Sequence, residues 1–125
     1  MFWEPIDSTP FSELTFHGVA ATSVNVDGQV IGITRVFSLK NKTMLTLEEW
    51  NYAASDGRVV MHEEFINQSV NGYPAIVTVR KNSKGRATSS IQWAKDEKLS
   101  TLTMSGHIRG NGHRNKLVVY AESLY

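Results

Sequence analysis

The chain has 125 residues, with 13 Lys and Arg against 12 Asp and Glu, and it contains no cysteine. This length fits one ordinary domain, and the absence of cysteine excludes disulfides, thiolate zinc sites, iron–sulfur clusters and cysteine nucleophiles. The net charge of +1 provides no overall field that would attract nucleic acid, so we expect no nucleic-acid partner.

The first half of the chain predicts short strands separated by turns. Asp27-Gly28 is a strong hairpin signal, and it predicts a type I′ turn, in which both central residues have positive φ. Residues 43–50 are ambiguous, because Thr43 and Thr46 favour a strand whereas residues 46–50 also suit the start of a helix. Strands are expected over residues 13–20, 22–26 and 29–40.

The second half predicts further hairpins and one terminal helix. Tight turns are expected at Asn71-Gly72 and Asp96-Glu97, and a loop over residues 105–112. Leu117, Tyr120, Ala121 and Leu124 then follow the spacing of one helix face. Strands are expected over residues 73–80, 87–94 and 98–104. These elements predict an α+β domain over residues 1–125, with one curved, half-open antiparallel sheet of about six to eight strands and a C-terminal helix packed on it.

Four segments of the second half resemble a known family in their order and residues. They are Val70-Asn71-Gly72-Tyr73-Pro74-Ala75, Ser90-Ile91-Gln92-Trp93, Leu102-Thr103-Met104-Ser105-Gly106 and the final Leu117-Val118-Val119-Tyr120-Ala121-Glu122-Ser123-Leu124. This pattern resembles the C-terminal part of the bacterial DUF4367 family, and a weaker likeness extends back to Gln29. That family is similar to the wider group that contains the lipoprotein carrier LolA and the regulators MucB and RseB.

The resemblance implies a half-open antiparallel barrel wrapped on helices. It also implies an extracytoplasmic or cell-surface domain of a longer chain, joined to a membrane only through a tether that this sequence lacks. Such a domain binds or senses a protein, peptide or lipid-like ligand, and no catalytic residue and no cofactor transfers from the family. Two departures are Leu99-Ser100-Thr101, where the family commonly has an aromatic residue, and a basic rather than acidic start of the last helix.

Basic residues cluster around the expected start of the last helix. Free backbone N–H groups and the helix dipole already favour anions there, so added cations are locally unfavourable unless a negative group lies nearby. That group would be an acidic partner, an anionic lipid headgroup, or a side chain of this protein such as Glu63 or Glu64. We therefore predict an anion- or partner-binding patch of His107, Arg109, His113, Arg114 and Lys116.

Three large aromatic residues, Phe37, Trp93 and Tyr120, are expected either in the core or along a ligand groove.

Metal binding and nucleophilic catalysis have little support in the sequence. His62-Glu63-Glu64-Phe65-Ile66 lacks the second histidine of a zinc-binding helix, and we predict no metal site. No Gly-x-Ser-x-Gly nucleophile motif occurs.

The sequence thus favours a non-catalytic binding domain. The alternatives are a small cytoplasmic interaction protein of the immunity or adaptor type and, more distantly, a small hydrolase or metal protein.

Overall fold

The computed structural model describes residue 6 and residues 10–39, 43–81, 83–84, 86–107 and 112–124. Three short 3₁₀ helices, η1, η2 and η3, span Phe11–Glu13, Ala53–Ser55 and Glu63–Phe65, and one α-helix, α1, spans Gly112–Ser123. The strands are β1 (Thr15–Val24), β2 (Val30–Ser38), β3 (Met44–Asn51), β4 (Gln68–Val70), β5 (Tyr73–Lys81), β6 (Arg86–Lys95) and β7 (Lys98–His107).

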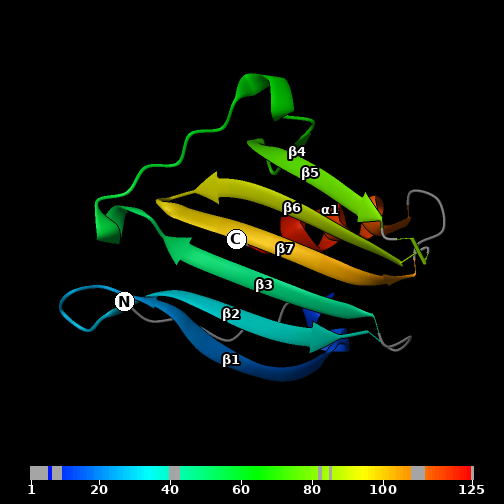
Figure 1. Ribbon diagram of the computed structural model, residues 1–125, viewed down its shortest axis with the longest axis horizontal. Coiled ribbons are helices and arrows are strands. Elements are labelled where there is room, and N and C mark those ends of the chain that lie inside the picture. Colours follow the sequence, from blue (N-terminus) through cyan, green and yellow to red (C-terminus); the bar gives the residue numbers. More distant parts are fainter. Residues whose placement is uncertain are drawn as a thin grey trace.

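The described strands form one seven-stranded antiparallel sheet in the order β1-β2-β3-β7-β6-β5-β4. The sheet is curved and unclosed, and α1 lies behind it in Figure 1, mainly against β4, β6 and β7. A long connection over residues 52–67 takes the chain from β3 past three strands to β4 at the opposite edge. The predicted α+β class, with one curved sheet and a C-terminal helix, is confirmed.

Two of the predicted tight turns have the expected backbone. Asn71 and Gly72 have φ values of 50° and 89° between β4 and β5, and Asp96 and Glu97 have φ values of 52° and 65° between β6 and β7. Positive φ at both central residues matches the twist of the flanking strands, which explains these short hairpins.

The turn between β1 and β2 is a hairpin, but the predicted type I′ geometry is wrong. Gly28 has a φ of 81°, whereas Asp27 is not among the positive-φ residues. The Gly28 N–H donates to the Asn25 carbonyl at 3.0 Å, and the Asn25 side-chain oxygen accepts the N–H groups of Asp27 and Gln29 at 3.0 Å each. The asparagine side chain therefore organises this loop, which leaves only the glycine in the left-handed region.

Several predicted boundaries also change. The predicted strands over 13–20 and 22–26 merge into one strand, β1, which spans only Thr15–Val24 and contains three register shifts. The ambiguous residues 43–50 lie almost entirely within β3. The predicted loop over 105–112 is wrong at its start, because β7 continues to His107 while paired with β6.

Alternation of side chains gives the sheet two distinct faces. The helix-side face contributes a buried cluster that also includes η1 and α1 residues; its members include Phe37, Leu45, Leu47, Ile91, Trp93, Leu102, Met104, Leu117, Tyr120 and Ala121. The opposite face is named the open face, since α1 lies on the other side of the sheet (Figure 1). Its central residues, all half-buried or exposed, are Thr34, Thr46, Glu48, Trp50, Thr78, Ser90, Gln92, Thr101 and Thr103.

Candidate functional site

The predicted basic patch at the start of α1 is only partly within the described residues. Arg109 and the side chains of His107 and His113 lie outside them. Lys116 is exposed, and Arg114 is half-buried. The patch as a whole therefore stays a prediction.

Arg114 has partners within the protein. Its Nη2 donates to the carbonyl oxygen of Asn67 at 2.7 Å and to the side-chain oxygen of Gln68 at 3.3 Å. The sequence pointed to Glu63 or Glu64 as the internal partner, but the guanidinium contacts a backbone carbonyl and an amide instead. Arg114 thus joins the first turn of α1 to the start of β4.

The aromatic residues Phe37, Trp93 and Tyr120 lie in the core and line no described groove. Their exposed fractions are 3%, 1% and 8%. Phe11 of η1 packs edge-on against both Phe37 and Tyr120, with ring centroids 5.3 and 5.2 Å away. The space between the helix and this part of the sheet is therefore filled by side chains.

The histidines and carboxylates do not assemble into a metal site in the described part of the chain, where no three such groups come together. His62 is exposed and makes an edge contact with Phe65, at a centroid distance of 6.2 Å. The neighbours Glu48 and Glu49 point to opposite faces, as expected for a strand, so they form no acid–base pair.

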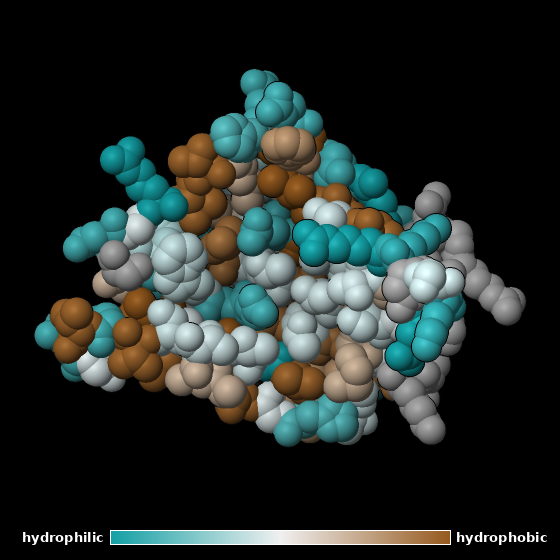
Figure 2. Space-filling model, in the orientation of Figure 1, coloured by the Kyte–Doolittle hydropathy of each residue, from teal (hydrophilic) through white to brown (hydrophobic). Residues whose placement is uncertain are grey.

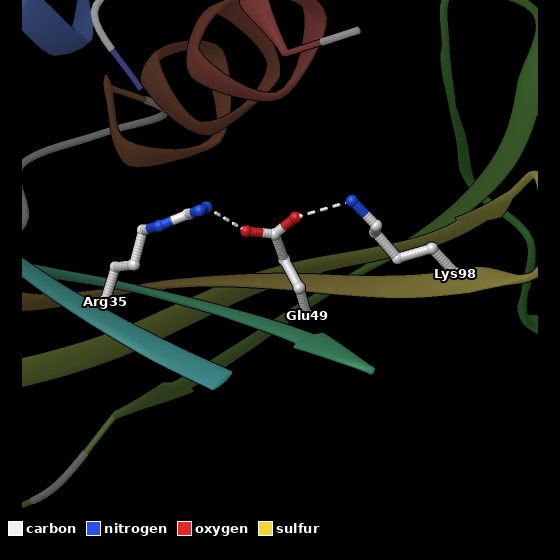
Figure 3. A network of polar contacts seen from close by, with 3 residues as sticks. All are labelled: Arg35, Glu49 and Lys98. Atoms are coloured by element: carbon white, nitrogen blue, oxygen red, sulfur yellow. Dashed lines mark hydrogen bonds and ion pairs between the residues drawn. The ribbon is translucent and has the colours of Figure 1, made fainter. Parts of the chain in front are cut away.

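A charged network is buried on the helix-side face. The Glu49 carboxylate is 2% exposed and pairs with Arg35 through one oxygen, and with the Lys98 ammonium at 3.0 Å through the other. Figure 3 shows the three side chains converging from β2, β3 and β7. Two cations around one carboxylate leave this cluster with a formal charge of +1.

Sequence reasoning missed this network, although the alternation contained a signal for it. Arg35 occupies a buried position between Ile33 and Phe37, and Glu49 follows the buried Leu45 and Leu47 at the same spacing. Opposite charges at core positions of neighbouring strands indicate a buried pair, because an unpaired buried charge is very unfavourable. All three groups are engaged with one another, which makes the network a structural feature of the sheet.

The open face presents rows of hydroxyl groups across the strands. Cross-strand register aligns Thr46, Thr103, Ser90 and Thr78 in one row through β3, β7, β6 and β5. The next row contains Thr34, Glu48, Thr101 and Gln92. Figure 2 views this face and shows a pale band of intermediate hydropathy through its middle. Hydroxyl and amide groups here are both donors and acceptors, and few of these side chains are charged.

A shallow cavity of about 240 Å³ lies at the β1–β3 end of this face. Its lining includes Thr22, Gly32, Glu48, Trp50, Gln92 and Thr101. Gly32 provides the hollow, since a Cβ atom at this position would stand 3.1 Å from Ser23 Cβ and 3.3 Å from Thr22 Oγ1. A larger residue would therefore crowd β1 and occupy the cavity.

The polar and aromatic groups of the cavity are held in place by their neighbours. Gln92 Nε2 donates to Thr101 Oγ1 at 3.1 Å, which orients both side chains. The Trp50 ring lies 6.2 Å from the Tyr52 ring and against the backbone of Gly57, where a Cβ would come within 3.4 Å of two ring carbons. An ordered aromatic surface thus adjoins oriented hydrogen-bonding groups.

Comparison of the chain with family models, with curated proteins and with solved structures finds no match. The described helix is too short and too polar to cross a bilayer.

Proposed function

We propose that this chain is a non-catalytic, extracytoplasmic binding domain that holds a neutral, hydroxyl-rich ligand of the carbohydrate class on its open face. The single observation that supports this proposal most is the cavity beside Trp50, lined by threonine hydroxyls and the Gln92 amide. The resemblance to the DUF4367 and LolA-like group supports the placement outside the cytoplasm.

The chemistry of the cavity favours a carbohydrate over other small ligands. Sugar rings present apolar C–H faces that stack on aromatic rings, and hydroxyl groups that donate to and accept from amide and carboxylate side chains. Trp50 supplies the ring, while Gln92, Thr101 and Glu48 supply the polar groups. The volume lies below that of most drug-sized pockets, which suits one or two sugar rings.

Lipid-like ligands have less support from the packing. A lipid-like ligand would need an open apolar groove between sheet and helix, but Phe37, Trp93 and Tyr120 are buried in that region. The lining of the open-face cavity is mixed, with hydroxyl groups beside Trp50 and Leu99, and it offers no long apolar channel.

Isothermal titration calorimetry with maltotriose, cellotriose and chitotriose tests the proposal. We expect at least one of these probes to bind, and Thr101→Val to weaken it by about two- to tenfold, the loss of one hydrogen bond. Thr103→Val is the matched control, because Thr103 lies on the same strand and face but outside the cavity lining. Equal loss in both variants, or no binding of any probe, contradicts the proposal.

A further inference from the structure

The two edges of the sheet differ in length. β4 forms one edge with three residues, whereas β1 forms the other with ten. Long edge strands are usually shielded by charged residues, proline or bulges, since their free N–H and C=O groups pair readily with another strand. The sequence from Leu14 to Val26 contains no Asp, Glu, Lys, Arg or Pro.

Apolar side chains are also exposed along β1. Phe16, Val19 and Val24 are 54%, 57% and 54% exposed. Phe16 and Val19 pair in register with Phe37 and Arg35, whose side chains are buried on the helix-side face. The apolar layer of that face therefore continues onto β1, whereas α1 packs mainly on strands at the other end of the sheet.

We propose that β1 is a dimerisation edge, at which two copies of this chain pair antiparallel about a two-fold axis near Val19. With the axis perpendicular to the sheet, each side chain meets one from the same face of the second copy. The exposed Phe16 and Val19 side chains of the two copies then extend one apolar layer. A two-fold axis brings like groups together, and like charges opposite each other are destabilising; a strand without charges avoids that cost.

The bulges of β1 define where the pairing occurs. Register shifts fall between Phe16 and Gly18 on one side, and between Ala21 and Ser23 and between Ser23 and Val24 on the other. Between these shifts, the four residues Gly18–Ala21 pair with β2 in regular register. Bulges increase the local twist and disrupt a ladder, so pairing is confined to this central segment. Because the edge at β4 is short, the assembly ends as a dimer and does not grow into a filament.

Sedimentation equilibrium on the full chain, with matched variants, tests this proposal. We expect the unmodified chain to form a reversible dimer, and Val19→Lys to raise its dissociation constant at least about tenfold, because two ammonium groups meet at the axis. Val60→Lys is the control, since Val60 is 74% exposed in the connection between β3 and β4. A monomer at all concentrations, or equal weakening by Val60→Lys, overturns the proposal.

Cross-linking gives a second readout, which does not depend on weakening the dimer. The chain has no cysteine, so Val19→Cys introduces a single thiol. Across the proposed axis this thiol lies beside the same thiol of the second copy, and the two Cα atoms are within the usual distance for a disulfide. We expect oxidised dimers from Val19→Cys and none above background from Val60→Cys. Equal cross-linking of both variants would show that the thiols meet by random collision, and it would contradict specific pairing at the β1 edge.

Discussion

Replacing Glu49 by glutamine probes how far the fold depends on its buried charges. The substitution keeps the shape of the side chain but removes its charge, which leaves the guanidinium of Arg35 in a site where its own side chain is only 7% exposed. Lys98 is affected less, because its side chain is 27% exposed and reaches water. Arg35 therefore sets the size of the effect.

Removing one partner of a buried ion pair typically costs about 3–5 kcal/mol. A domain of this size has a free energy of unfolding of about 5–15 kcal/mol, so Glu49→Gln removes a large share of it. With a urea m-value of about 2 kcal/mol/M, a loss of about 4 kcal/mol lowers the urea midpoint by about 2 M. Equilibrium unfolding followed by circular dichroism measures this shift.

The neighbouring Glu48 provides the control, because it is exposed on the open face. Glu48→Gln is expected to change stability by less than about 0.5 kcal/mol. The double variant Arg35→Met/Glu49→Leu is expected to recover much of the loss, since apolar residues of similar volume often replace a buried pair without net cost. If Glu49→Gln and Glu48→Gln unfold at the same urea concentration, the buried network does not hold the sheet together.

Three further predictions concern the core, one turn and the response to pH. Trp93→Ala, at a position that is 1% exposed, is expected to destabilise the protein by about 3–5 kcal/mol in urea unfolding. Gly72→Ala, at a φ of 89°, is expected to lower the free energy of unfolding by about 1–2 kcal/mol in the same measurement, because a Cβ atom is unfavourable at positive φ. An unchanged urea midpoint would contradict this requirement for glycine. Burial, with a smaller contribution from the Glu13 carboxylate, raises the pKa of Tyr120 above its usual value. Tyr120 then ionises more readily in the unfolded chain, so its contribution to stability is complete below the usual pKa and is lost as pH rises above it. Between about pH 8 and about pH 11, thermal unfolding should show a larger loss of stability for the unmodified chain than for Tyr120→Phe.

Much of the fold follows from local patterns in the sequence. Alternating apolar residues and the pairs Asn71-Gly72 and Asp96-Glu97 predict the second half well, because each pair accepts the positive φ of a tight turn. The type I′ prediction for the β1–β2 turn is wrong because the side chain of Asn25, two residues before Asp27, accepts hydrogen bonds from the loop backbone. Local propensity does not include such side-chain contacts.

The candidate site was less predictable than the fold. The cavity requires Gly32, Trp50 and Gln92 to come together from β2, β3 and β6, and their relation depends on strand order. Strand order in turn depends on the crossover from β3 to β4, which no turn signal specifies. The aromatic residues expected in the core or along a groove pack inside the core. Phe37 and Trp93 lie at helix-side positions of β2 and β6, and Tyr120 lies on the side of α1 that faces the sheet.

The most direct test of the central claim is a two-dimensional ¹H–¹⁵N NMR titration of the intact chain with the oligosaccharide that binds most tightly. If the open face holds the ligand, the largest shifts gather at the cavity-lining residues Thr22, Gly32, Trp50, Gln92 and Thr101. Shifts confined to the start of α1 around Arg114 and Lys116, or to the β1 edge, would contradict it.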